Sequence, residues 1–272
     1  RRRCVMRANT VRQAWREGKA TVGGWLSLPD SFAAEVMAHQ GFDWLTVDMQ
    51  HGLIDYSSAV PMLQAISTTS TTPFVRVPWN DPATIMKVLD AGAYGVVVPL
   101  VNNREEAERA VGACRYPPRG FRSSGPIRAA IYGGSGYQEA SHQHIACILM
   151  IETADGIANL DEILSVDGVD GIYIGPSDLS YALGMPPRMD NEDPTHQATV
   201  GKILEACRRH NVAAGIHTGG VAYSAKWLKL GFQMVTLTSD ANCLVRAAQQ
   251  QLRELREETG LATAVGDRAA VY

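Results

Sequence analysis

Short apolar runs rich in β-branched residues recur along the chain, and each is followed by a turn and then by apolar residues at helical spacing. Eight such runs predict strands at residues 21–28, 44–49, 74–79, 94–101, 147–153, 171–176, 213–218 and 234–239. Several of them, such as residues 95–98, are apolar on both faces, which is typical of a parallel sheet covered by helices. Eight strand–helix units in roughly 250 residues predict an α/β fold, a single (β/α)8 TIM barrel.

A doubly wound sheet is the other common fold that alternates strands and helices. It places a glycine-rich phosphate-binding turn after the first strand, whereas residues 26–29 contain no glycine. We therefore predict one barrel domain at residues 6–258, with a leader or expression remnant at 1–5 and a flexible tail at 259–272. The two longest connections, residues 116–144 and 180–194, are expected at the carboxyl ends of the strands, where substrate loops lie.

Composition limits the partners of the chain. A net charge of −3 over 272 residues provides no basic surface for nucleic acid or for an anionic membrane. No apolar stretch reaches the ~18 residues that span a bilayer, and the first residues lack the apolar segment of a secretory signal. The five cysteines include no C-x-x-C pair that would bind zinc or exchange disulfides. These features predict a cytoplasmic protein that binds a small molecule.

Two carboxylates fall at neighbouring strand ends, where the chemistry of a barrel takes place. Glu152 lies near the end of the run at 147–153, and Asp178 follows the run at 171–176. A small set of oxygen ligands suits Mg²⁺ or Mn²⁺ better than Zn²⁺. Either residue alone could instead cap a helix or face solvent. Because Glu152 stands in an otherwise apolar run, and a buried carboxylate is costly without a partner, we expect a metal or a cation beside it.

Arg76 is a candidate for binding an anion in the barrel mouth. Alternation along residues 74–78 places its side chain on the inner face of the strand. A guanidinium there can bind a carboxylate or a developing enolate. The alternative is a structural ion pair with Asp90 or Glu152.

Two histidines and a glycine pair also fall near the mouth. His51 could be a general base near neutral pH, oriented by Asp48 at the end of the preceding strand, or it could be a solvated loop histidine. His217 ends its strand and points into the mouth. Residues 219–220, both glycine, could open a phosphate-binding helix or an ordinary helical turn.

Lysine is scarce, and its positions exclude one mechanism. An aldolase that forms a Schiff base needs a lysine that projects from a strand into the barrel. The chain has five lysines, of which one precedes the first strand and four fall in predicted helices: Lys19, Lys87, Lys202, Lys226 and Lys229. Carbon–carbon chemistry in this barrel is therefore expected to use a metal, in agreement with the two carboxylates.

Several motifs, in matching order and spacing, resemble the HpcH/HpaI family of metal-dependent class II pyruvate aldolases, which includes 4-hydroxy-2-oxoheptanedioate aldolase. The resemblance covers residues 6 to about 256. It rests on residues 41–44 with the Asp48 and His51 that follow, and on segments 75–82, 115–120, 151–153 and 168–180.

The resemblance implies a role for each candidate residue. Glu152 and Asp178 would hold one divalent ion, Mg²⁺ or Mn²⁺ with Co²⁺ possible, and no organic cofactor would be needed. The main-chain amides of Ser177 and Asp178 would bind the pyruvate carboxylate. Arg76 would stabilise the enolate oxygen, and His51 would accept the proton of the substrate hydroxyl. The implied reaction is cleavage of a 4-hydroxy-2-oxo acid, similar to 4-hydroxy-2-oxoheptanedioate, to pyruvate and an aldehyde.

The resemblance also implies that Asp90 raises the basicity of His51 and that the chain forms hexamers, trimers of dimers, which exchange the last helix at residues 241–258. The residues themselves do not support the role of Asp90. It ends the helix after the third strand, so it is expected at the opposite end of the barrel.

Three positions depart from the family pattern: Gln50 replaces a common glutamate, Met150 a substrate-contacting glutamine, and His217 an apolar residue. The residues that the resemblance assigns to the metal and to the enolate are retained, so the three departures concern the residues that contact the rest of the substrate. An oxaloacetate decarboxylase or a macrophomate-synthase-like enzyme would use the same enolate and is the alternative prediction. A barrel that binds an oxo-acid without catalysis is a third.

Overall fold

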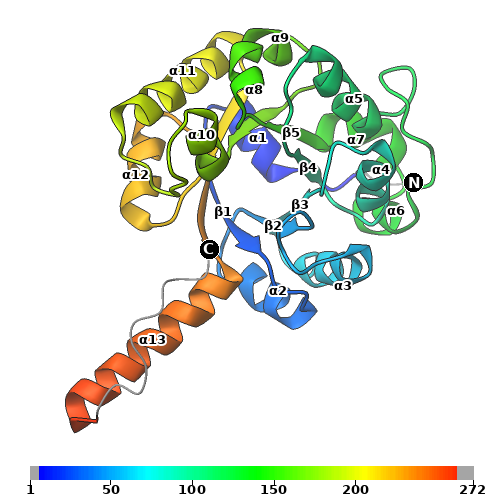
Figure 1. The fold of residues 1–272 in the computed structure, drawn as a ribbon. Coiled ribbons are helices and arrows are strands. Elements are labelled where there is room, and N and C mark those ends of the chain that lie inside the picture. Colours follow the sequence, from blue (N-terminus) through cyan, green and yellow to red (C-terminus); the bar gives the residue numbers. More distant parts are fainter. Residues whose placement is uncertain (1–5, 262–272) are drawn as a thin grey trace.

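The structure is a computed structural model and describes residues 6–261. Eight parallel strands close into a barrel in sequence order, as predicted (Figure 1). The strands are β1 (Thr21–Leu26), β2 (Trp44–Asp48), β3 (Thr72–Arg76), β4 (Gly95–Val98), β5 (Ala146–Met150), β6 (Gly171–Ile174), β7 (Ala213–His217) and β8 (Met234–Ser239). Most of them end earlier than the apolar runs suggested. Glu152 therefore follows β5 instead of lying within it.

Helices surround the barrel and begin at the caps that the sequence provides. Asp30, Asp55, Asp81 and Asn103 each accept a hydrogen bond from a first-turn amide of the helix that follows. The helices are α1 (Thr10–Arg16), α2 (Ser31–Ala38), α3 (Tyr56–Ile66), α4 (Pro82–Asp90), α5 (Arg104–Cys114), α6 (Ile127–Gly133), α7 (Tyr137–His144), α8 (Ala154–Ala158), α9 (Leu160–Leu164), α10 (Pro176–Ala182), α11 (Pro194–His210), α12 (Val221–Leu230) and α13 (Asp240–Thr259).

Alternating side chains along the strands build two separate cores. Inward-facing residues such as Trp44, Phe74 and Ile148 fill the barrel interior. The residues between them, such as Leu45 and Val75, pack under the surrounding helices. This alternation places Arg76 on the inner face with Phe74, as predicted.

Helix α1 closes the amino end of the barrel. Its Trp15 belongs to the inner core and donates through Nε1 to Thr21 Oγ1 at 3.0 Å and to the Gln233 carbonyl at 3.1 Å. Arg12 of the same helix donates to Asp170 Oδ1 at 2.6 Å, while Arg115 donates to Asp170 Oδ2 at 2.9 Å. One buried carboxylate thus joins the amino-terminal helix to two distant parts of the chain.

The long connection at residues 116–144 lies at the amino end of the barrel, and its predicted place at the carboxyl end was wrong. Helix α5 begins soon after β4, so the long segment follows the helix and leads back to the start of β5. It carries α6 and α7 and ends beside α1, where Asn9 Nδ2 donates to the His144 carbonyl at 2.8 Å. The other predicted connection, residues 180–194, does lie at the carboxyl end: it begins in the short helix α10 directly after β6 and precedes α11, which leads back to β7, and its Met189 lines a cavity at that end.

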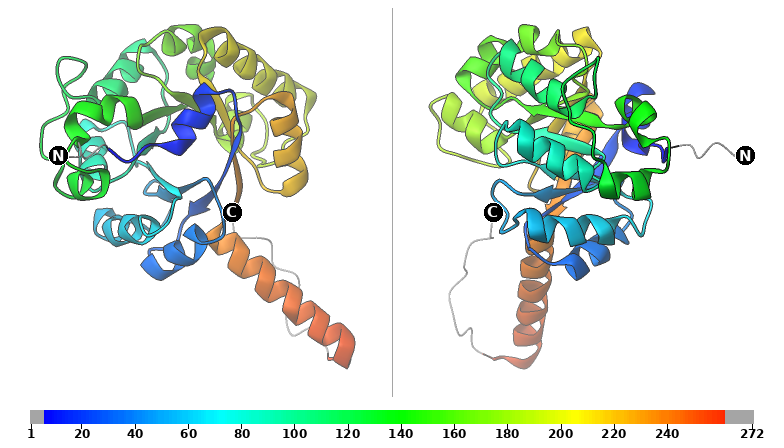
Figure 2. Two further views of the ribbon diagram at one scale, coloured as in Figure 1. Left: turned by 180° about the vertical axis from the view of Figure 1, so that it is seen from behind. Right: turned by 90° about the vertical axis from the view of Figure 1, so that its right-hand side faces the viewer.

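Helix α13 projects away from the barrel (Figures 1 and 2). Among its described residues only Asp240 is buried, while Leu244, Leu252 and Leu255 are exposed. Its exchange between subunits stays a prediction, and the tail predicted at 259–272 lies largely outside the described residues, as does the segment 1–5. Across residues 6–261, no helix combines the length and apolarity that crossing a membrane requires.

Candidate active site

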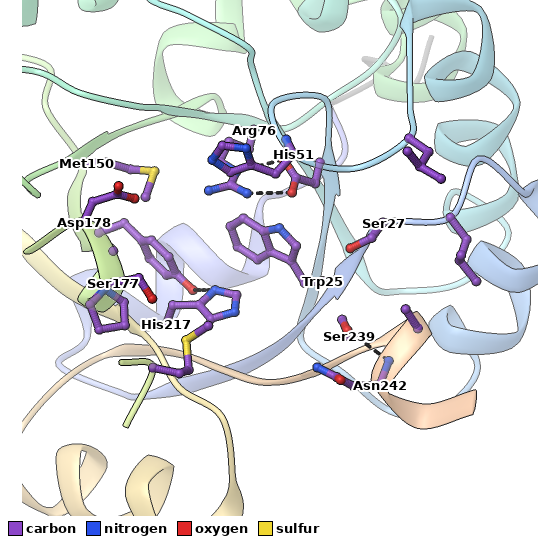
Figure 3. Close-up of a pocket in the computed structure, with 18 residues that line it drawn as sticks. Trp25, Ser27, His51, Arg76, Met150, Ser177, Asp178, His217, Ser239 and Asn242 are labelled. Atoms are coloured by element: carbon purple, nitrogen blue, oxygen red, sulfur yellow. Dashed lines mark hydrogen bonds and ion pairs between the residues drawn. The ribbon is translucent and has the colours of Figure 1, made fainter. Parts of the chain in front are cut away.

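A cavity of about 330 Å³ opens at the carboxyl ends of the strands (Figure 3). It contains five of the predicted site residues: His51, Arg76, Met150, Ser177 and Asp178. Its other lining residues come from β1, the loop after β2, β6 to β8 and the start of α13: Trp25, Ser27, Leu28, Asp48, Leu53, Tyr173, Gly175, Pro176, Met189, His217, Ser239, Ala241 and Asn242.

Arg76 is held by Asp48, and the predicted alternatives of Asp90 and Glu152 were wrong. The two residues end neighbouring strands and are paired in register. Asp48 Oδ1 accepts from Arg76 Nε at 2.8 Å, and Oδ2 accepts from a terminal guanidinium nitrogen at 2.6 Å. Burial alone would lower the pKa of Arg76, but the ion pair outweighs it and raises that pKa. The guanidinium is thus a fixed, permanent cation in the cavity.

His51 lies in a turn that the same aspartate organises. Asp48 Oδ1 accepts from the amides of Gln50 at 3.0 Å and of His51 at 3.3 Å. Gly52 permits the tight turn, because a Cβ at that position would lie 2.3 Å from the Asp48 carbonyl oxygen. Asp48 therefore positions both Arg76 and the backbone of His51, whereas the sequence suggested only the histidine.

Glu152 lies beside the cavity with half of its carboxylate unsatisfied. Oε1 accepts from the Leu100 amide at 3.0 Å, whereas Oε2 is buried without a hydrogen-bond partner. Burial, together with the charge of Asp178, raises the pKa of Glu152 to about 7. Gly175 makes room for the carboxylate, since a Cβ there would lie 2.2 Å from Oε2.

These features fit a divalent cation between Glu152 and Asp178. A hard cation satisfies a buried carboxylate oxygen that lacks a donor, and it also relieves the repulsion from the charge of a second carboxylate. The described residues contain no cluster of three or more histidine, cysteine or acidic ligands. Two carboxylates with water and substrate in the remaining positions suit Mg²⁺ or Mn²⁺.

The turn that carries Ser177 and Asp178 is supported by a buried polar network. The Pro176 carbonyl accepts from Ser180 Oγ at 2.7 Å and lies 3.2 Å from His196 Nε2. Asn191, in the loop after α10, donates to Ser180 Oγ at 2.9 Å. No side chain caps the first turn of α10. Its amides are therefore available to an anion in the cavity.

An aromatic group that the sequence did not single out forms the floor of the cavity. Trp25 stacks on Tyr173 with ring centroids 5.5 Å apart, and the Arg76 guanidinium lies 5.0 Å from the Trp25 ring. The Tyr173 hydroxyl lies 3.1 Å from His217 Nδ1 and also bonds to Thr236 Oγ1. Inward alternation at Trp25 and Tyr173 was the signal that could have identified them.

Asp90 lies outside this cavity. It ends α4 and forms an ion pair with the buried Arg122 at 2.6 Å, in the long connection at the amino end of the barrel. This placement agrees with its position in the sequence, and the role that the resemblance implies for it stays a prediction. The amide of Gly219 donates to Asp190 at 2.7 Å, so a protein carboxylate bonds to the glycine pair considered for phosphate.

Comparison with known proteins decides the family. The sequence profile of the HpcH/HpaI aldolase/citrate lyase family matches residues 21–247. The chain belongs to this family. As a family member whose relatives are aldolases, it is a carbon–carbon lyase of a family that depends on divalent metal.

Two curated relatives and one solved structure illustrate the likeness. A hydroxypyruvate/pyruvate aldolase of Rhizorhabdus wittichii is 42% identical over 248 residues, spanning 91% of this chain and 99% of the relative. A 4-hydroxy-2-oxo-heptane-1,7-dioate aldolase of Salmonella dublin is 36% identical over 261 residues, spanning 95% of this chain and 98% of the relative. A family protein of Burkholderia cenocepacia superposes with a TM-score of 0.86 at 32% identity, covering 92% of this chain and all of that one.

Proposed function

We propose that this protein is a divalent-metal-dependent aldolase that cleaves a 4-hydroxy-2-oxo acid to pyruvate and an aldehyde. One observation carries the proposal. Glu152 has a buried, partnerless carboxylate oxygen, and the charge of Asp178 helps to raise the pKa of this group, beside a cavity that also holds the fixed guanidinium of Arg76. The names of the curated relatives support the same reaction class.

Substrate binding would use the first turn of α10 and the arginine. The amides of Ser177 and Asp178 would donate to the carboxylate of the oxo acid, where the helix terminus favours an anion. Arg76 would donate to the oxygen at carbon 2. Because Asp48 fixes this guanidinium, it would need little reorganisation as negative charge develops on that oxygen. Met150 would contribute apolar contact beside the same group.

Bond cleavage would begin when His51 accepts the proton of the hydroxyl at carbon 4. The carbon–oxygen double bond of the aldehyde forms as the bond between carbons 3 and 4 breaks, and its electron pair moves to the oxygen at carbon 2. A divalent ion bound by Glu152 and Asp178 would supply a Lewis acid for that oxygen. Arg76 would share the charge, and a proton returned to carbon 3 completes pyruvate.

Oxaloacetate decarboxylation is the second candidate, because loss of carbon dioxide delivers electrons to the same oxygen and needs no general base. The presence of His51 in the cavity favours aldol chemistry over decarboxylation. A macrophomate-synthase-like reaction would use the same groups.

The deciding experiment has two parts. In the first part, the protein is incubated with pyruvate in D₂O and saturating Mn²⁺ or Mg²⁺, and NMR measures the exchange of the methyl protons of pyruvate for deuterium. EDTA should stop this exchange. A panel of 4-hydroxy-2-oxo acids plus oxaloacetate, with released pyruvate coupled to NADH oxidation, then separates cleavage from decarboxylation. Full turnover in EDTA would refute the metal role. The absence of both proton exchange and turnover would favour a non-catalytic barrel.

We further propose that the protein is a homo-oligomer, a hexamer built as a trimer of dimers, that exchanges α13 between subunits. The exposed leucines of this projecting helix support the proposal, since a second chain would cover them. Light scattering coupled to size exclusion would test it, with a variant truncated after residue 240 expected to lose the hexamer. The ion preferred in the cell and the cytoplasmic location stay predictions.

A further inference from the structure

The cavity has two sides of different chemistry. The charged groups lie at the ends of β2 and β3 and in the first turn of α10, where Asp48, Arg76 and Asp178 face it. The polar residues around β7, β8 and β1 carry no formal charge: Ser27, His217, Ser239 and Asn242, called here the neutral wall. Figure 3 shows Asp178 and Ser177 on one side, Ser27, Ser239 and Asn242 on the other, and His217 between them.

His217 is held as an uncharged hydrogen-bonding group. Tyr173 engages its Nδ1, and the edge of Trp25 packs against the ring with centroids 5.0 Å apart. Burial, assisted by the charge of Arg76, lowers the pKa of His217 to about 3. With Nδ1 engaged, Nε2 is the nitrogen left for the cavity. It serves as a donor or an acceptor according to the tautomer, and a neighbouring hydroxyl can satisfy either.

The other part of the neutral wall is fixed by Asp240 at the start of α13. Its carboxylate accepts from the Ser27 amide at 2.9 Å and from the Leu28 amide at 3.1 Å, which ties the loop after β1 to the helix. Ser239 caps α13 by accepting from the Asn242 amide at 3.2 Å. The wall is therefore a built surface with defined positions for hydroxyl and amide groups.

Among the described lining residues, none on the neutral wall is an arginine or a lysine. In the whole described lining of the cavity, Arg76 is the sole arginine, no lysine is present, and Arg76 is already paired with Asp48. The guanidinium of Arg246, on α13, donates instead to the Gly219 carbonyl at 2.7 Å. A carboxylate on the far half of a substrate would lose its hydration here and gain no ion pair, which is unfavourable.

Building on the proposed aldolase function, we infer that the neutral wall binds the aldehyde half of the substrate and selects a short, uncharged, hydroxylated aldehyde, with His217 as the determining residue. Neighbouring strands are about 5 Å apart, so β7 and β8 lie roughly 5 to 10 Å from the end of β6. That span suits the two or three carbons beyond the bond that is cleaved. An apolar residue at position 217 would offer no partner to the hydroxyl.

The test compares four aldehydes in the addition direction, with saturating pyruvate and Mn²⁺; the first two are of equal size. Glycolaldehyde presents a hydroxyl where propionaldehyde presents a methyl, and glyoxylate and succinic semialdehyde present a carboxylate. We expect kcat/KM for glycolaldehyde to exceed that for propionaldehyde and for both acids by about tenfold or more, because a polar site left unpaired penalises the analogue.

The variant His217→Phe should reduce the glycolaldehyde to propionaldehyde ratio about tenfold, and His217→Gln, which keeps a neutral hydrogen-bonding group, should restore part of it. His39→Phe makes the same change at an exposed position at the end of α2 and should leave the ratio unaltered. Using a ratio within each variant cancels any general loss of activity.

Two results would overturn the inference: a ratio unchanged in His217→Phe, or a wild-type preference for either acid. Proton exchange of pyruvate in D₂O keeps this outcome separate from the aldolase proposal. If exchange occurs and the aldehydes are not discriminated, only the neutral wall is refuted. If wild-type protein shows no exchange, the proposed function itself fails.

Discussion

Glu152 makes the metal-free protein sensitive to pH in a direction that can be calculated. Burial and the charge of Asp178 raise its pKa from an ordinary 4.5 to about 7. Between these values the folded state binds more protons than the unfolded state, so the free energy of unfolding falls as pH rises. At about 1.4 kcal/mol for each pH unit, the loss between pH 4.5 and pH 7 is about 3 kcal/mol.

Removing the charge should abolish this loss. Glu152→Gln in the presence of EDTA should unfold about 6 to 12 °C above the wild type at pH 8, and the gap should close toward pH 5. The exposed Glu162→Gln is the matched control and should follow the wild type at every pH. Asp178→Asn should reduce the pH effect without removing it, because burial is the larger cause.

Metal should stabilise the wild type but not the Glu152→Gln variant. Mn²⁺ in excess should raise the unfolding temperature of the wild type at pH 8, where Glu152 is ionised, and should leave Glu152→Gln nearly unchanged. Differential scanning fluorimetry across pH 5 to 8 measures both effects. If the wild type and Glu152→Gln show parallel pH profiles in EDTA, the reasoning about the buried carboxylate is refuted.

Three further substitutions test other parts of the structure. Arg76→Lys keeps the charge but loses the paired hydrogen bonds with Asp48, so kcat should fall about 10²-fold; a change confined to KM would contradict the enolate role. Asp170→Asn leaves two buried guanidinium groups without a carboxylate partner and should lower the free energy of unfolding in urea by about 3 to 5 kcal/mol; a decrease below 1 kcal/mol would argue against a tight network. Asn191→Ala removes a buried side chain that donates to Ser180, so it should raise KM for the oxo acid several-fold in addition to a modest loss of stability; an unchanged KM would show that the first turn of α10 does not depend on Asn191.

The barrel could be predicted because its signals are local. Strand runs recur eight times, and aspartate caps and glycines mark the ends of several of the helices between them, so the signals point to the same fold. His51, Arg76, Met150 and Asp178 could be placed at the mouth for the same reason, since strand ends of a parallel barrel share one edge.

Side-chain pairing across strands was harder to predict. Arg76 pairs with Asp48 because β2 and β3 align these residues, and register between strands depends on packing that no single run of sequence encodes. The long connection at 116–144 was predicted at the wrong end of the barrel. Helix α5 lies between β4 and this connection, so the connection starts at the amino end. The neutral wall combines residues from three strand ends and α13, so its shared lack of charge emerges only in three dimensions.

Helix α1 carries a consequence for how the chain reaches its native state. The contacts that seal the amino end join Trp15 to the carbonyl of Gln233 and Arg12 to Asp170, across 218 and 158 residues. During synthesis the helix emerges long before Asp170 and Gln233. The ribosome must therefore add more than 200 residues after α1 before the barrel floor can form, and any barrel half made on its own would expose the inner face of α1 to solvent.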